Sequence, residues 1–167
     1  LDPTESQFDS MHCYFSSGVA GHEINFVLTE LEASGITDDQ VQSFCNAEFR
    51  VGLAQMMFTI KDSDFKGMAS QTLAFIPIFN YFLQKFMRGR LAPEMLLCFG
   101  ALTDVVKQLQ KLKLQFPTKQ ADEQRLLNLQ NVHMELYAAA WGRSSCKPKH
   151  HYGLHVPLQV ARGKILL

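Results

Sequence analysis

The clearest hydrophobic pattern in the chain follows Pro93. Apolar side chains recur there at alternating steps of four and three residues, which is the spacing of one face of an α-helix: Cys98, Leu102, Val105, Leu109, Leu112 and Phe116. The opposite face carries Lys107, Lys111 and Lys113. Pro93 suits the first position of a helix, where the backbone N–H has no partner within the helix. The pattern therefore predicts an amphipathic helix over 93–116.

The same three- and four-residue spacing predicts further helices over 11–33, from 37 through 45, over 70–86 and over 118–141. A weaker helical pattern runs over 49–60, and a last segment covers 149–163. Gly35 is expected to end the first helix, and a cap at Thr37 to begin the second. The helix over 70–86 is apolar on nearly all sides, which predicts a central, buried position between the helices over 93–116 and 118–141.

No alternating pattern typical of strands is found, except at the final three residues 165–167. We therefore predict an all-α fold, an irregular bundle of about five to seven helices with a short strand at the C-terminus. One domain over 1–167 fits this length. The chain begins without Met and ends on an apolar run, Ile165-Leu166-Leu167, and we expect it to be a fragment of a longer protein.

Charge is unevenly distributed, although the net charge is zero. Residues 1–65 contain eleven Asp and Glu against two Lys and Arg, a balance of −9, and residues 66–167 have a balance of +9. Such asymmetry is typical of proteins with a nucleic-acid or acidic partner on the basic side. Mutual neutralisation of the two halves in the fold explains it equally simply.

The spacing of the cysteines and the hydropathy of the chain indicate the cellular compartment in which we expect the protein. The four cysteines are far apart in sequence, and Cys45 and Cys98 lie in apolar helical stretches, where a free thiol behaves as a small core side chain. This favours reduced thiols and an intracellular protein. The first residues show no signal-peptide pattern, and no run of eighteen apolar residues is present to span a membrane.

Histidines cluster in the segment from Lys147 to Pro157. His151 and His155 are four residues apart, which places both on one helical face and suits a metal ion, with His150 beside them. Zinc needs three or four ligands, however, so the structural interpretation, in which these rings hydrogen-bond within the fold, stays open. His133 lies on an apolar helical stripe and is expected to be a hydrogen-bonded core histidine.

Enzyme motifs are missing from the sequence. It contains no GxSxG nucleophile motif and no glycine-rich phosphate loop, and the paired carboxylates occur at expected turns and helix starts. Basic side chains gather near the C-terminus, with Tyr152 close to them. We expect four of them to contact nucleic-acid phosphates: Lys147, Lys149, Arg162 and Lys164.

Two short motifs resemble a known family. Asp9-Ser10-Met11-His12, followed by Gly18-Val19 and an apolar helix, resembles the Asp-x-x-His signature of eukaryotic cut-and-paste DNA transposases of the CACTA type. Near the other end, Lys149-His150-His151 with His155 resembles the Lys-x-His-x-x-x-His segment of the same group. Asp9, His12, His151 and His155 are the residues that match the signature. In that family both segments lie near one active centre, so the resemblance implies that they approach each other.

The resemblance implies a particular place in a larger enzyme. Such transposases have a ribonuclease-H-like nuclease whose three carboxylates bind two magnesium ions, interrupted by an all-helical insertion. This chain would correspond to the insertion, with no complete catalytic site and no cofactor of its own. We therefore expect DNA contact or self-association in the nucleus, without DNA cleavage.

Two rival interpretations come from the residues. The first is a helical interaction module in which the stripe from Cys98 to Phe116 binds a partner helix. The second is a metal-binding protein that uses His150, His151 and His155.

Overall fold

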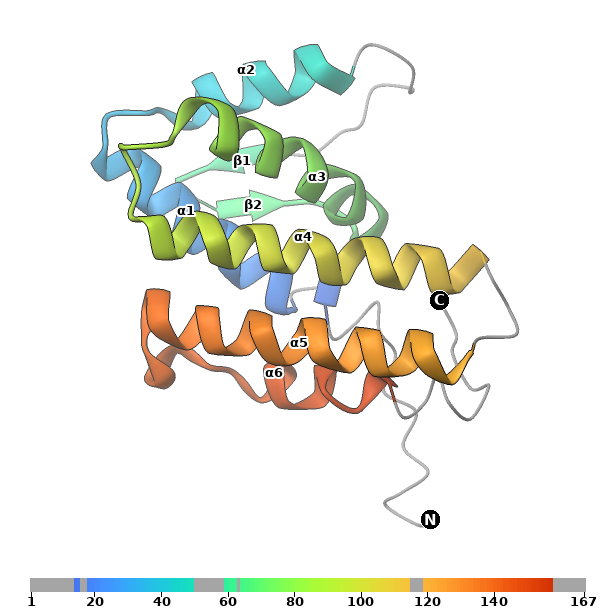
Figure 1. Cartoon of the computed structure of the whole chain (residues 1–167). Helices are drawn as coiled ribbons and strands as arrows, with labels where there is room; N and C mark the ends of the chain where they lie inside the picture. Colours follow the sequence, from blue (N-terminus) through green and yellow to red (C-terminus); the bar gives the residue numbers. More distant parts are fainter. Residues whose placement is uncertain (1–13, 16–17, 50–58, 63, 115–118, 158–167) are drawn as a thin grey trace.

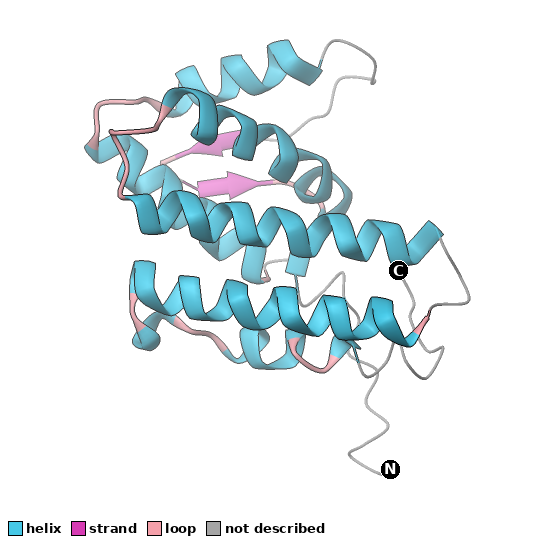
Figure 2. Cartoon of the chain, in the orientation of Figure 1, coloured by secondary structure: helices cyan, strands magenta, loops and turns pink. Residues whose placement is uncertain are grey.

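The computed structural model describes residues 14–15, 18–49, 59–62, 64–114 and 119–157. Within them the chain forms six α-helices, one two-stranded hairpin and a short 3₁₀ turn (Figure 1). The elements are, in order, α1 (Val19–Ala33), α2 (Asp38–Phe49), β1 (Thr59–Lys61), β2 (Asp64–Lys66), α3 (Ala69–Phe86), α4 (Pro93–Leu114), α5 (Gln120–Trp141), η3 (Arg143–Ser145) and α6 (Pro148–Gly153). The prediction of an all-α bundle of five to seven helices is confirmed (Figure 2).

The helices form a stack. In Figure 1, α2 lies at one end, followed by α3, α4, α5 and α6, while α1 and the hairpin lie behind α3 and α4. The most extensive helix contact joins α4 to α5, and α1 contacts both α3 and α4. Two long helices therefore form the centre, and α1 ties them to the hairpin.

The central position belongs to α4 rather than to α3. We expected α3 between α4 and α5, but α5 packs on the far side of α4, and α3 contacts α2, α1 and α4. One edge of α3 reaches solvent, with Tyr81 45% and Phe86 44% exposed. The apolar run over 70–86 predicted burial correctly for one face of the helix, but it could not indicate which neighbour covers each side. The buried residues are Thr72, Phe75, Ile76, Phe79, Phe82 and Leu83.

The stripe on α4 is buried as its spacing predicted. Cys98, Leu102, Val105, Leu109 and Leu112 are each at most 3% exposed. Phe116 lies outside the described residues. Since α5 and the other helices of this chain already cover the stripe, it offers no free surface to the partner helix that the interaction-module interpretation requires.

Aromatic rings fill the space between α3 and α4. Phe79 is completely buried, and its ring centroid lies 4.9 Å from that of Phe75, 6.2 Å from that of Phe82 and 5.2 Å from that of Phe99. Rings at these separations add specific edge and stacking contacts to the burial of apolar area. Six of the Phe residues whose burial the structure describes are in the core: Phe15, Phe65, Phe75, Phe79, Phe82 and Phe99.

The hairpin was not predicted. We expected a helical stretch over 49–60, but Thr59–Lys61 is a strand that pairs antiparallel with Asp64–Lys66, and residues 50–58 lie outside the described part. Strands of three residues are too short to show an alternating pattern. What holds them is a tertiary contact, since the Asn25 side chain of α1 binds both the Asp64 carboxylate (2.7 Å) and the Phe65 amide (2.9 Å).

Other boundaries differ slightly from prediction. The first helix begins at Val19, residues 14–15 form a π-helical turn, and Gly35 follows the helix with φ 80°, as its role in ending the helix requires. The loop predicted after Gly142 contains the η3 turn. The strand predicted over 165–167 lies outside the described residues. No helix in the part of the chain that the structure describes is long and apolar enough to cross a membrane.

Candidate nucleic-acid interface

Helix α6 presents the predicted histidine pair at the surface. Pro148 occupies its first turn and His151 lies within it, while His155 follows in the turn after its end. The Nε2 atoms of the two histidines are 3.3 Å apart, His151 is exposed and His155 is half-buried. The two rings therefore lie together, as the four-residue spacing predicted.

His150 turns the other way. It is 2% exposed, its Nδ1 accepts a hydrogen bond from the Lys147 amide at 3.0 Å, and its ring centroid lies 4.4 Å from that of Tyr137. Burial, more than the nearby His133, lowers the pKa of His150 to about 4. His150 is thus a neutral core residue that begins α6. The structure does not bring it together with the outward pair of His151 and His155.

Lys147 and Lys149, at the start of α6, lie near enough to His22 on α1 for their charges to act on it. Burial, followed by the charges of Lys147 and Lys149, lowers the pKa of His22 on α1. Lys147 is exposed and Lys149 half-buried, and the Tyr152 ring is 41% exposed beside them. We call His22, Lys147, Lys149 and Tyr152 the basic edge. The other two predicted contact residues, Arg162 and Lys164, lie outside the described residues.

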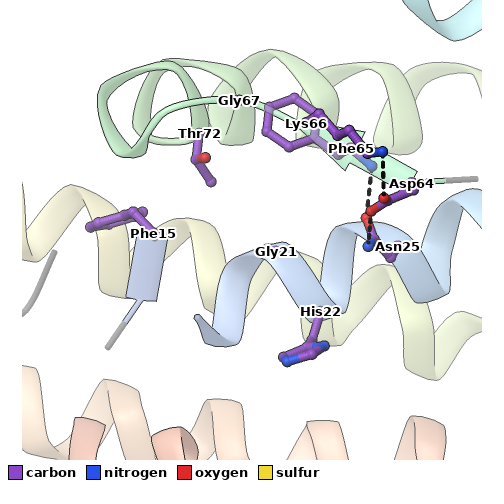
Figure 3. A pocket seen from close by; sticks show the side chains of 9 residues that line it. All are labelled: Phe15, Gly21, His22, Asn25, Asp64, Phe65, Lys66, Gly67 and Thr72. Atoms are coloured by element: carbon purple, nitrogen blue, oxygen red, sulfur yellow. Dashed lines mark hydrogen bonds and ion pairs between the residues drawn. The ribbon is translucent and has the colours of Figure 1, made fainter. Parts of the chain in front are cut away.

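Sequence reasoning did not include His22 in this edge. A single histidine on a helix 125 positions before Lys147 carries no signal, and only the fold places the two together. Figure 3 shows the His22 side chain pointing from α1 away from the hairpin.

Tyr14 packs beside α6. The Gln130 side chain on α5 donates to the Tyr14 hydroxyl at 2.8 Å and to the Gly153 carbonyl at 2.9 Å. A Cβ atom at position 153 would lie 3.0 Å from the Tyr14 hydroxyl, so only glycine fits without a shift. Tyr14 follows His12 by two residues, and Gly153 is midway between His151 and His155. Asp9 and His12 themselves lie outside the described residues.

A pocket of about 480 Å³ lies between α1 and the hairpin (Figure 3). His22, Asn25, Asp64 and Lys66 contribute its polar lining. Two of these polar groups are already paired within the fold, because Asn25 binds Asp64 and the Lys66 ammonium lies 3.7 Å from the Asp64 carboxylate. Because the charges of Asp64 and Lys66 are paired with each other, the lining does not indicate a particular ligand.

One group of three metal-binding side chains is found among the described residues, and it is not the histidine cluster. Glu23, Cys98 and His133 lie together in the core, with one ligand atom of each within 4.8 Å of the others. Sequence reasoning placed His133 and Cys98 in the core correctly. It missed Glu23, because a glutamate on an amphipathic helix ordinarily faces solvent.

Comparison with known proteins finds no matching family model, no matching curated protein and no matching solved structure. What can be inferred of function therefore depends on the residues and geometry of this chain.

Proposed function

We propose that this chain is the helical region of a transposase-like protein and that its basic edge contacts the phosphate backbone of DNA. The single observation that carries the contact is the convergence of His22, Lys147 and Lys149 from two helices. Burial, and after it the charges of the two lysines, disfavours a positive charge on His22. Lysines gathered at one edge attract anions, and DNA presents a dense row of them.

Two further features support the proposal. The exposed Tyr152 ring adds an aromatic surface next to the lysines, which suits contact with sugars or unpaired bases. Tyr14, two residues after His12 in sequence, packs against Gly153, which lies between His151 and His155. Such an approach is what the transposase resemblance implies for Asp9/His12 and His151/His155.

The proposed role is binding, without sequence preference and without cleavage, in the nucleus. Backbone contacts position a protein on DNA but do not read its bases. Two-metal cleavage needs three carboxylates around the ions, and the resemblance assigns the final glutamate of that set to a segment beyond this chain. Self-association of the same fragment remains compatible with this role.

Titration of a labelled duplex at low and moderate salt tests the proposal. We expect binding that weakens steeply with salt, because each lysine that neutralises a phosphate releases condensed counterions. Changing Lys147, Lys149, Arg162 and Lys164 to alanine should abolish most of it, and Lys147→Ala/Lys149→Ala alone should reduce the slope of log K against log salt by about 2.

The matched control is Lys107→Ala/Lys119→Ala, which removes the same charge from exposed positions on α4 and before α5. Equal loss in both double variants would mean that binding follows overall charge and that the basic edge is not the site. Nicking of the duplex with magnesium or manganese would contradict the expectation of no cleavage.

A further inference from the structure

The core of the molecule contains a carboxylate, a thiol and an imidazole that come from three different helices. Glu23 lies on α1, Cys98 on α4 and His133 on α5, and all three residues are at most 1% exposed. The Nε2 atom of His133 lies 2.6 Å from Oε2 of Glu23, and the Cys98 sulfur lies within 4.8 Å of the ligand atoms of both. Figure 1 shows these helices meeting at the centre of the stack, away from the outer surface of α6.

One polar atom of this cluster lacks a hydrogen-bond partner among the described residues. Oε1 of Glu23 is buried and has no hydrogen-bond partner in the part of the chain that the structure describes. A charged carboxylate removed from water needs its oxygens paired, so an unpaired oxygen at this depth indicates a missing cationic or donor group.

We infer that Glu23, Cys98 and His133 bind a zinc ion that fastens α1 to α4 and α5. A carboxylate, a thiolate and a neutral imidazole are the three ligand types that zinc takes in proteins, whereas magnesium and calcium prefer sites built from oxygen alone. The carboxylate and the thiolate together carry two negative charges. A divalent ion therefore makes the filled site neutral, which a buried site in an apolar surrounding requires.

Only small side-chain movements are needed. Zinc bonds of about 2.0 to 2.3 Å to tetrahedral ligands place neighbouring ligand atoms roughly 3.2 to 3.8 Å apart. The contact between Glu23 and His133, now 2.6 Å, must therefore widen by about 1 Å, and the Cys98 sulfur, which lies within 4.8 Å of both, must come to that spacing. Binding releases the Cys98 proton to solvent, so affinity should rise with pH.

Three side chains leave the fourth position of a tetrahedral zinc ion to a small ligand such as water. Glu23 Oε1 is the unpaired atom, and a second, longer contact from it to the ion would satisfy it without filling that position. His150 is also near and buried, but its Nδ1 accepts the Lys147 amide hydrogen. Since a neutral imidazole has one hydrogen, the Nε2 atom of His150 carries it and cannot bind a metal in this arrangement.

The inference is independent of the proposed DNA contact and goes beyond it. A metal in the core would have a structural role, because it joins helices whose ligands are 75 and 35 residues apart in sequence. The outward pair of His151 and His155 is a separate place where zinc can bind, and the experiment has to distinguish the two.

Cobalt and zinc titration of the full chain, purified with a chelator that is then removed, tests the inference. We expect one cobalt ion to produce a thiolate-to-metal charge-transfer band in the near ultraviolet. At a hundredfold excess of zinc over its Kd, the unfolding midpoint should rise by about 5 to 10 °C. X-ray absorption at the zinc edge of the unmodified chain should show one sulfur neighbour with nitrogen and oxygen.

Cys98→Ser should lose the cobalt band and the zinc-dependent shift. Its control, Cys45→Ser, removes another buried free thiol and should retain both. Glu23→Gln provides a second variant of almost unchanged shape. Circular dichroism without metal establishes that each variant folds, and the absorption spectrum of the unmodified chain decides the question if one does not.

Three results would overturn the inference. The first is the lack of a charge-transfer band in the unmodified chain. The second is a band that survives Cys98→Ser but not Cys45→Ser. The third is a zinc spectrum with nitrogen neighbours and no sulfur, which would place the ion on His151 and His155 only.

Discussion

Gly153 lies so close to Tyr14 that a single added carbon would stand 3.0 Å from the tyrosine hydroxyl. This contact joins the N-terminal segment to α6 across most of the chain, and Gln130 fixes it by donating to both residues. Tyr14 and α6 are therefore held together by one glycine and one buried glutamine.

Gly153→Ala should destabilise the protein by about 1–3 kcal/mol, because the new methyl group forces the Tyr14 ring or α6 to move. Chemical denaturation measures the change. The control is Gly21→Ala on α1, where a Cβ meets nothing within 4 Å. In that helix alanine should stabilise by about 0.5–1 kcal/mol. Equal effects in the two variants would mean that Tyr14 does not pack on α6.

Acid should weaken the fold through His150. Its pKa is about 4 in the folded protein and about 6.5 in the unfolded chain, so the unfolded state takes up the proton first as pH falls. The part of the free energy of unfolding that depends on a neutral His150 is complete above pH 6.5. It is lost between pH 6.5 and 4 and amounts to about 2–3 kcal/mol. Urea unfolding at pH 7 and pH 4 measures this change.

His150→Asn is the matched variant for that experiment, because its side-chain oxygen can still accept the Lys147 amide hydrogen while it does not titrate. Carboxylates that titrate in the same range act in both proteins, so the difference between them isolates His150. An identical pH dependence in the two proteins would contradict a buried, neutral His150.

The buried pair of Glu23 and His133 should show strong coupling. Without metal, Glu23→Ala should cost about 3–5 kcal/mol, because it leaves the His133 ring without its partner in the core. Glu23→Leu combined with His133→Leu should cost less than the two single changes together, because no polar group is then left unpaired. Glu30→Ala, on the same helix and only half-buried, should change stability by no more than about 0.5 kcal/mol. Additive effects at positions 23 and 133 would show that the pair is not coupled.

Removal of a central ring tests the aromatic core. Phe79→Ala should destabilise by about 3–5 kcal/mol, since the side chain is completely buried and three other rings surround it. Phe86→Ala, on the same helix but 44% exposed, should cost much less. A smaller loss at position 79 than at position 86 would mean that the core is not built around α3 and α4 as described.

Local periodicity was sufficient to predict much of the fold. The α4 stripe from Cys98 to Leu112, the start of α4 at Pro93 and the stop at Gly35 depend on interactions within a few residues, so the sequence alone determines them. The same holds for the burial of Cys45, Cys98 and His133, whose neighbours on the helix are apolar. The four-residue spacing of His151 and His155 also predicted that the two rings lie together, although His155 is in the turn that follows α6.

Features that join distant residues required the tertiary structure. Asn25 stabilises a hairpin too short to have a pattern of its own, and α5 packs on α4 instead of α3 because of side-chain fit between whole helices. Burial of Glu23 opposite His133 depends on how α1 crosses α4 and α5, and no periodicity within one helix specifies that crossing. The sequence by itself thus determined the helices and most of their buried faces. The tertiary structure alone decided which polar side chains meet between them, because a polar residue is stable in a core only where another helix supplies its partner.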